Sequence, residues 1–421
     1  MTNLFKNLKP DFFKDILKTG IDYFYINLVD RLVAFFSFLL LARAFDSHLY
    51  GKIVTVFAVS TIVMTVFDFG LPIYAQRESA KKESLQDTFD ELYPVKVLSI
   101  ILYIVLLPVI AFSFYKDIPP GIIAIIGGII LLQNISNLFS FVYYGKDESR
   151  FVLKTNVISK IFFIVIISVS FLFYRNIYFF LAGYIVAYLY SGVVLSLKLS
   201  QFNIKVKLFE LTFKKLRSTL LIILPLGIAS ALNLVYDKID IVILSAYLDY
   251  DKIAQYSVAY TIYRLSGIVF SIILFPALNQ FSRLADDLHQ NIRLLFRYLV
   301  TSCLVSVILI LIYIYVVSEL IPILFGPEYL EASRVIIPLS FAIFLWSLNA
   351  IIGVYLNGLG LFKEVMIASV SGMIINIIIN IILIPKIGIL GAVYTTIITE
   401  FLIFMVEIIF VFFNYKKNVS I

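Results

Sequence analysis

Long apolar stretches, separated by short polar segments, run along the whole chain. Each is about 20 residues or longer, the length that an α-helix needs to cross a bilayer, and charged residues, glycine, proline or asparagine mark its ends. The pattern predicts an all-α integral membrane protein with about twelve transmembrane helices. The expected spans lie near residues 21–42, 52–75, 94–115, 121–143, 155–174, 177–198, 218–246, 255–280, 295–317, 334–357, 364–384 and 388–413.

One longer polar segment separates the first six spans from the last six. It predicts an N-terminal six-helix lobe over 1–198, a cytoplasmic linker over 199–217 and a C-terminal six-helix lobe over 218–421. The segment 1–20 is basic and amphipathic, and it shows no apolar core followed by a small-residue cleavage site. We therefore expect this segment to be a cytoplasmic N-terminus instead of a removable signal peptide.

The two halves resemble each other weakly. A displacement of about 203 residues aligns "LARAFDSHLYG" with "LSAYLDYDKIA", each with a helix end, an acidic turn and a helix start, and brings Pro72 near Pro276. A slightly larger displacement places Gly145 on Gly358. Because each half has an even number of spans, the repeat is parallel. Such repeats predict two six-helix lobes around a central cavity, as in transporters whose lobes are related by an axis along the membrane normal.

Composition and charge agree with a membrane protein. The chain is 61% hydrophobic and 14% charged, against about 45–50% and 25% in soluble domains. Its net charge of +7 comes from short clusters of Lys and Arg between the apolar runs, and no basic domain suited to nucleic acid occurs. About 23 of these cations fall on one side of the predicted membrane and six on the other. The positive-inside rule then predicts that both termini are cytoplasmic.

Signatures of enzymes and metal sites are lacking in the sequence. One cysteine, Cys303, excludes a disulfide or a cysteine-based metal site within one chain. The two histidines, His48 and His289, lie in expected loops, and no HExxH, P-loop, GxSxG or GxGxxG motif is present. We expect neither catalysis nor a resident cofactor or metal ion.

Charged residues inside the first span are costly in a bilayer and need a reason. Asp30 and Arg31 lie near the middle of this span. They line a cavity or form an Asp–Arg pair satisfied by neighbouring helices. A polar or small stripe at helical spacing contains Tyr23, Asn27, Asp30, Ala34 and Ser37.

The seventh and eighth spans carry similar groups. In "YDKIDIVIL", Asp237 and Asp240 share a helix face, with Lys238 beside them, and the alternatives are a gate or local ion pairs near the membrane surface. In the eighth span, Tyr260 and Arg264 share a face. An arginine fork at this depth suits a phosphate, and the alternative is an ion pair with an acidic side chain such as Asp240 or Asp30.

Several segments, in order, resemble the polysaccharide flippase branch of the multidrug/oligosaccharidyl-lipid/polysaccharide exporter superfamily. They are "LARAFDSHLYG", "DFGLPIYAQRESA", "LPLGIASALNLVYDKIDIVILSAYLDYDKIAQYSVAYTIYRL", "LFGPEYLEASRVIIPLS" and "IPKIGILGAVYTTIITE". The resemblance covers most of the chain. It implies a bacterial inner-membrane flippase with a cationic cavity between two lobes, which moves undecaprenyl-diphosphate-linked oligosaccharide units for O-antigen, lipopolysaccharide, capsule or a related polymer by alternating access. The lipid bilayer, a polysaccharide polymerase and a chain-length regulator are the other partners that it implies.

Residue patterns and resemblance together select two sets of candidates. The substrate-binding candidates are Asn27, Asp30, Arg31, Lys160, Tyr260 and Arg264. The gating or ion-coupling candidates are Asp68, Asp237, Lys238, Asp240 and Glu400. For Asn376 and Asn380 in the eleventh span, hydrogen bonding between helices is expected instead.

Two other functions stay open at this point. A drug or metabolite antiporter of the same superfamily would use H⁺ or Na⁺, with acidic residues such as Asp30 or Asp240 carrying the coupling. A membrane polysaccharide polymerase or ligase would also be polytopic. Such enzymes have a large extracytoplasmic loop, whereas the longest one expected here, 318–333, is short.

Overall fold

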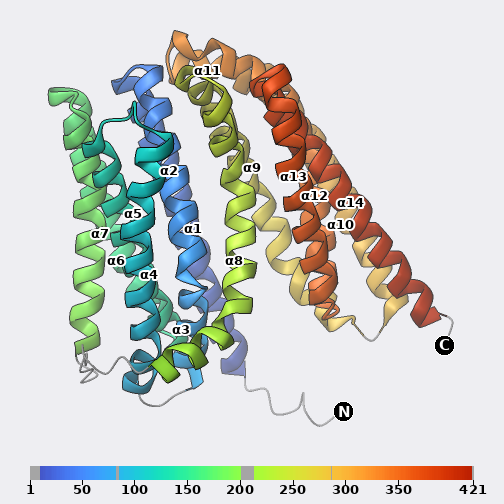
Figure 1. The fold of residues 1–421 in the computed structure, drawn as a ribbon. Helices are drawn as coiled ribbons and strands as arrows, with labels where there is room; N and C mark the ends of the chain where they lie inside the picture. The colour runs from blue at the N-terminus through green and yellow to red at the C-terminus, as the bar shows by residue number, and fades with distance from the viewer. Residues whose placement is uncertain (1–9, 82–84, 201–212, 286, 420–421) are drawn as a thin grey trace. The chain divides into compact units, whose positions relative to one another are not determined.

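The described part of the protein is helical. A computed structural model describes residues 10–81, 85–200, 213–285 and 287–419, and no strand occurs within these ranges. Figure 1 shows the helices and their labels. Twelve described helices have at least 21 residues: α1 Pro10–Ala44, α2 Ser47–Asp68, α4 Leu85–Phe114, α5 Pro120–Gly145, α6 Ser149–Val169, α7 Ile177–Ser200, α8 Phe213–Tyr247, α9 Tyr250–Arg283, α10 Leu288–Ile312, α12 Leu330–Gly358, α13 Phe362–Ile387 and α14 Ile389–Val419.

One of these long helices lies over each predicted span, so the prediction of twelve helices is confirmed. Over the described residues, ten helices are long and apolar enough to cross a membrane. Two of the spans continue through a π-helical turn: Ser170–Tyr174 extends α6 and Tyr313–Val317 extends α10. The apolar runs form helices because a helix satisfies its own backbone hydrogen bonds in the bilayer.

The second span is shorter than predicted. It ends at Asp68 instead of near residue 75, because Phe69 and Gly70 both adopt positive φ angles of 53° and 74°. A left-handed backbone cannot continue a right-handed helix. A separate short helix, α3 (Leu71–Lys81), follows this turn and was not predicted.

Helix boundaries follow the weak repeat in the sequence. The α1–α2 turn lies between Ala44 and Ser47, and its counterpart in the second half, the α8–α9 turn, lies between Tyr247 and Tyr250. Likewise, α5 ends at Gly145 and its counterpart α12 ends at Gly358. The displacement between the halves grows where the second half inserts α11 (Ser318–Leu324) and a short 3₁₀ helix (Pro327–Tyr329) between α10 and α12.

The chain divides into two compact units, each with its own apolar core. Unit 1 comprises residues up to Leu41 and Ser60–Ala231, and unit 2 comprises Ala42–Val59 and Leu232–Ile421. The core of unit 1 contains Leu71, Val142, Leu195 and Ile223, among others. The core of unit 2 contains Phe281, Leu295, Ile351 and Tyr355, among others. The turn between α1 and α2, with the first part of α2, therefore packs with unit 2.

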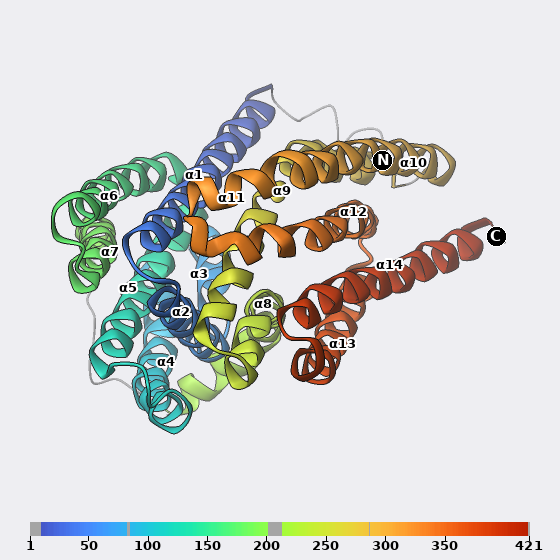
Figure 2. The ribbon, with the colours of Figure 1, turned by 90° about the horizontal axis from the view of Figure 1, so that it is seen from above.

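Within unit 2, the last two helices form a tight hairpin. Gly388 alone joins α13 to α14, with a positive φ of 64° that glycine adopts without strain. The two helices lie side by side, and α14 also packs on α12 (Figure 2). Within unit 1, α6 and α7 pack on each other in the same way.

Candidate functional site

In unit 1, Asp30 lies at the centre of a polar cluster built from three helices. Its carboxylate lies 3.2 Å from Nζ of Lys160 on α6 and accepts hydrogen bonds of 3.3 Å from Nδ2 of Asn156. Lys160 also lies over the ring of Tyr188 on α7, 5.3 Å from its centroid. The spacing of Asn156 and Lys160, four residues apart, places both on one face of α6. The Asp30 side chain stays 43% exposed, so the cluster is accessible from one side.

The other two candidates of the first span flank this cluster. Arg31 follows Asp30 on α1 and is exposed. Asn27 belongs to the same helix, but its side chain lies outside the described residues. Asp30, Arg31 and Lys160 therefore place two cations and one carboxylate in the same part of unit 1.

Asp68 belongs to a different, buried cluster of unit 1. Nζ of Lys96 on α4 lies 3.1 Å from its Oδ1, and both residues are buried. Lys96 also donates a hydrogen bond to the side-chain oxygen of Asn134 on α5. The charges at the end of α2 are thus paired with each other inside the unit. Lys96, which the charge count assigned to the cytoplasmic side, is buried inside the unit.

In unit 2, α8 and α9 bring four of the sequence candidates together. Asp237 lies 3.1 Å from the guanidinium of Arg264 and 3.3 Å from Nζ of Lys238, and it accepts a 3.2 Å hydrogen bond from the hydroxyl of Tyr260. The ion pair of Arg264 is therefore with Asp237. Even so, 45% of the Arg264 side chain is exposed, in the middle of a helix of 34 residues. The guanidinium group of Arg264 can therefore donate further hydrogen bonds to a ligand.

Asp240 is held by neutral groups. It is buried, and its two oxygens accept hydrogen bonds from the hydroxyl of Tyr256 at 2.7 Å and from Nδ2 of Asn380 at 2.6 Å. Asn380 also donates to Oδ1 of Asn376, one turn away on α13. These bonds link α8, α9 and α13, so Asn380 bonds between helices, as expected. A carboxyl group held in this way suits the binding of a proton or a small cation.

Glu400 occupies a comparable position on α14. One of its oxygens accepts a 2.9 Å hydrogen bond from the hydroxyl of Tyr236 on α8, and the other accepts a 2.6 Å hydrogen bond from Nδ2 of Asn349 on α12. Asn349 also donates to the backbone oxygen of Glu400 at 2.9 Å. Asp240 and Glu400 are thus buried carboxyl groups of unit 2 that are each satisfied by side chains from two other helices.

A further polar region of unit 2 was missed by the sequence analysis. Ser47, in the first turn of α2, donates a hydrogen bond to Asp251 in the first turn of α9, and Nδ1 of His48 lies 3.3 Å from the same carboxylate. The two turns approach so closely that a Cβ on Gly51 would lie 2.0 Å from the backbone oxygen of Tyr250. Only glycine permits this approach.

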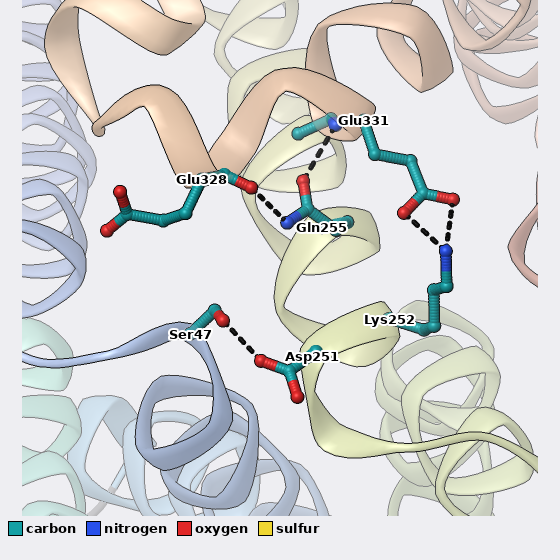
Figure 3. Close-up of polar contacts among 7 residues, drawn as sticks. Ser47, Asp251, Lys252, Gln255, Glu328 and Glu331 are labelled. Atoms are coloured by element: carbon teal, nitrogen blue, oxygen red, sulfur yellow. Dashed lines mark hydrogen bonds and ion pairs between the residues drawn. The ribbon is translucent and has the colours of Figure 1, made fainter.

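Figure 3 shows how α9 also holds the segment before α12. The buried Gln255 donates a 2.7 Å hydrogen bond to the backbone oxygen of Glu328 and accepts a 2.9 Å bond from the backbone N–H of Ala332. One turn away, Lys252 lies 2.6 Å from the carboxylate of the exposed Glu331. The inserted segment is thus fixed to α9 by a buried amide and an exposed ion pair.

Arg43 completes this region at the end of α1. Its guanidinium donates a 2.6 Å hydrogen bond to the backbone oxygen of Leu324 and a second one to that of Ile323. These carbonyl groups end α11 and have no partner within the helix, so a cation there is favourable. The rings of Tyr50 and Tyr329 also meet edge to face, with centroids 6.0 Å apart. The hairpin tip is the name used below for residues 42–59, which comprise the end of α1, the α1–α2 turn and the first part of α2.

Sequence reasoning missed most of the partners of the predicted residues. Asn156 and Lys160 lie four residues apart in an apolar span, a polar pair that could have been recognised as one face. For Tyr236, Asn349 and Lys96 no comparable signal exists, because their roles depend on which helices pack together.

A profile of the family described as "Polysaccharide biosynthesis protein" matches residues 16–282, well over half of the chain. The chain belongs to this family. A relative, described as an uncharacterized membrane protein of Methanocaldococcus jannaschii, is 28% identical over 299 residues, 67% of this chain and 57% of the relative. A probable low-salt glycan biosynthesis flippase of Haloferax volcanii is 28% identical over 212 residues, 49% of this chain and 44% of the relative. The matched part of the chain thus spans about half the length of these relatives.

Two solved structures share the fold of this member of the family. A lipid II flippase in an inward closed conformation superimposes with a TM-score of 0.73 and 17% identity, covering 94% of this chain and 87% of the other. An inward-facing multidrug resistance transporter of the multidrug/oligosaccharidyl-lipid/polysaccharide exporter superfamily gives 0.70 and 13%, with 91% and 95% covered. The predicted fold is confirmed, and so is membership of a polysaccharide biosynthesis family. The Haloferax volcanii relative is described as a probable flippase, which agrees with a protein that is not an enzyme.

Proposed function

We propose that the protein is a flippase that moves a lipid-linked oligosaccharide, in which the lipid carrier and the sugar are joined through phosphate, from one leaflet of a membrane to the other by alternating access. Undecaprenyl diphosphate is the proposed carrier, and the oligosaccharide is a repeat unit of a cell-surface polymer such as O-antigen or capsule. Family membership supports a role in polysaccharide biosynthesis. The relative named as a glycan biosynthesis flippase supports the transport step.

The observation that carries this proposal is the exposed guanidinium of Arg264. It lies midway along α9, where a charge is costly unless it serves a partner, and its pairing with Asp237 leaves 45% of the side chain exposed. A guanidinium fork binds phosphate oxygens in two parallel hydrogen bonds. Arg31 and Lys160 supply further cations in unit 1. Arg264 is the proposed phosphate contact of unit 2, and Arg31 and Lys160 are the proposed phosphate contacts of unit 1.

The proposed coupling residue is Asp240. Its buried carboxyl group has only neutral hydrogen-bond partners, Tyr256 and Asn380, so gain or loss of a proton or Na⁺ would change the net charge of this part of unit 2. Asp68, Asp237, Lys238 and Glu400 are proposed to take part in gating. Both H⁺ and Na⁺ are candidates for the coupling ion.

The distribution of Lys and Arg along the chain supports an orientation in the membrane. We propose that both termini are cytoplasmic, that residues 1–198 and 218–421 act as two lobes joined by 199–217, and that the membrane is the bacterial inner membrane. A polymerase and a chain-length regulator are the proposed partners. Reporter fusions after Lys416 that are active only outside the cytoplasm would overturn this orientation.

The test uses the purified full-length protein in lipid vesicles with a fluorescent lipid-linked oligosaccharide, and measures how fast the probe becomes accessible to an impermeant quencher. Arg264→Ala is expected to slow flipping on the order of tenfold or more, since a hydrogen bond to a charged group contributes about 1.5–3 kcal/mol. Arg283→Ala, at the end of the same helix, is the matched control and keeps the wild-type rate. Unchanged flipping by Arg264→Ala removes Arg264 from the site, and a wild-type protein that flips no such lipid overturns the function.

A cation-coupled drug or metabolite antiporter is the second candidate, and the buried carboxyl group of Asp240 is the observation that favours it. The same vesicles distinguish the two functions. An antiporter would drive a cationic dye against its gradient when H⁺ or Na⁺ flows the other way, and the lipid-linked oligosaccharide would stay in its leaflet.

A further inference from the structure

α14 carries a second buried carboxyl group, which the function proposed above does not use. Glu400 and Glu407 are 4% and 5% exposed. Seven residues separate them, so both lie on one face of the helix, about 10 Å apart along its axis. That face packs on α12: Asn349 donates to Glu400, and a Cβ on Gly353, one turn further, would lie 3.5 Å from Oε1 of Glu407.

The two carboxyl groups have opposite surroundings. Both oxygens of Glu400 accept hydrogen bonds, from Tyr236 and from Asn349. Oε2 of Glu407 is buried and has no hydrogen-bond partner among the described residues, and no described cation forms an ion pair with it. On α12, where it packs on α14, Oδ1 of Asn349 is also buried and has no donor within the described part of the chain. These two buried acceptors between α12 and α14 therefore have no donor among the described residues.

The charged group that acts on Glu407 is another carboxyl group, so it does not stabilise a carboxylate there. Glu400, on the same helix, is the charged group that acts on it, and two negative charges there would repel each other. Arg264 of α9 acts on Glu400, and no charged group of α12 or α13 within the described residues acts on Glu407. A buried carboxylate without donor or cation is strongly disfavoured, so the group takes up a proton instead.

The apolar surroundings of Glu407 show that a carboxyl group is not needed for packing at this position. The adjoining core of unit 2 contains Phe404, Phe410, Val411 and Ile352, and an apolar side chain would pack among them without an unsatisfied oxygen. A Cβ on Gly353 would make only an ordinary van der Waals contact with the carboxyl group, so α12 approaches Glu407 without offering it a donor at this position. A buried ionisable group kept under these conditions in a membrane helix points to proton binding.

We propose that Glu407 is a proton-binding site, and that it works in series with Glu400 to couple proton movement to transport; the coupling rests on the proposed function. The ligand is the proton itself. In the structure, Glu400 accepts hydrogen bonds from Tyr236 and Asn349. In the proposed cycle, Glu407 holds the proton in this state. Loss of the bond from Asn349 would free its amide for Glu407 and favour release of the proton.

The first test asks whether Glu407 is protonated, without reference to transport. Dicyclohexylcarbodiimide reacts with protonated carboxyl groups in apolar surroundings, and mass spectrometry of the labelled full-length protein in lipid locates the adduct. We expect roughly fivefold or more adduct at Glu407 than at the hydrogen-bonded Glu400, falling as the pH rises. The infrared absorption of protonated carboxyl groups should lose one band in Glu407→Gln, and this band should persist in Glu400→Gln. Equal labelling of both residues, or none at Glu407, overturns the site.

The second test asks whether the proton matters for transport. Glu407→Gln keeps the shape of the protonated side chain, so it should elute and unfold as the wild type does. Its flipping rate should no longer respond to an imposed pH gradient. A wild-type response to the gradient in Glu407→Gln overturns the coupling role. If the wild-type protein flips no lipid-linked oligosaccharide, the proposed function fails, whereas the labelling still decides whether Glu407 binds a proton.

Discussion

His48 and Asp251 occupy equivalent positions of the two sequence repeats, and they contact each other. Nδ1 of His48 lies 3.3 Å from Oδ2 of Asp251. Each is the second residue of its helix, α2 or α9. A contact between equivalent positions is the arrangement found on a two-fold axis. Both side chains are about half exposed, at 49% and 52%, so the pair contributes little to stability and can separate readily.

We expect transport to require release of the hairpin tip from α9. In a Cys303→Ser background, His48→Cys and Asp251→Cys should be joined by a short, reducible thiol cross-linker, because the native side chains are in contact. Flipping in vesicles should stop after cross-linking and return after reduction. His48→Cys alone, treated with the same reagent, is the control. A cross-linked protein that flips at the full rate would show that the tip stays in place during the cycle.

The buried pair of Asp68 and Lys96 should behave as a structural unit. Removing one charge, as in Lys96→Met, leaves the other buried without its partner and should destabilise the protein by roughly 3–5 kcal/mol. Asp68→Leu combined with Lys96→Met should recover most of this loss. The measurement is thermal unfolding of the purified variants.

Flipping by that double variant then decides the role of Asp68. A folded double variant without transport assigns Asp68 to the gate. Wild-type transport assigns the pair to stability alone. A single Lys96→Met variant as stable as the wild type would contradict the pairing.

The pair of Asp30 and Lys160 should matter more for transport than for folding. Because the Asp30 side chain is 43% exposed, Asp30→Asn should change the free energy of unfolding by less than about 1 kcal/mol. Flipping should fall on the order of tenfold, since Lys160 loses the carboxylate that positions it. Asp30→Asn with Lys160→Gln should not restore transport. Recovery in the double variant would assign the pair to structure and leave Arg264 as the better phosphate contact.

Gln255 should be the strongest single anchor of the segment inserted before α12. Gln255→Ala leaves the oxygen of Glu328 and the N–H of Ala332 without their partner, which costs about 1–3 kcal/mol for each buried group left unsatisfied. Lys252→Ala, which removes only an exposed ion pair, should cost at most about 1 kcal/mol. The fluorescence of Trp346 during thermal unfolding gives both values. An equal Tm for the two variants would contradict this ranking.

Sequence alone predicted the helices well because each span is a local property. A run of about twenty apolar residues determines a span, and the repeat located the α1–α2 and α8–α9 turns closely. The break after Asp68 was missed because nothing in "DFG" shows that Phe69 adopts a positive φ. The sequence placed Pro72 in the second span, where the structure has the start of α3.

Contacts between helices were less predictable. The stripe through Tyr260 and Arg264 lies on one helix and could be recognised, whereas its partner Asp237 depends on how α8 and α9 pack. For Asp30 and Arg31 the sequence left a cavity-lining role and an Asp–Arg pair open, and it did not reveal the contacts that Asp30 makes with Lys160 and Asn156 of α6. Helical spacing assigns residues to a face, and only tertiary packing decides which face lies opposite.

Because a single glycine connects α13 and α14, we expect these two helices to move together. Asn380 on α13 holds Asp240, and Glu400 on α14 is held by Asn349 of α12, so the same hairpin carries one end of each bond. Gly388 is the only residue between them, so the connection is too short for one helix to tilt far from the other. A change of charge at Asp240 or at Glu400 therefore acts on a hydrogen bond of the same pair of helices.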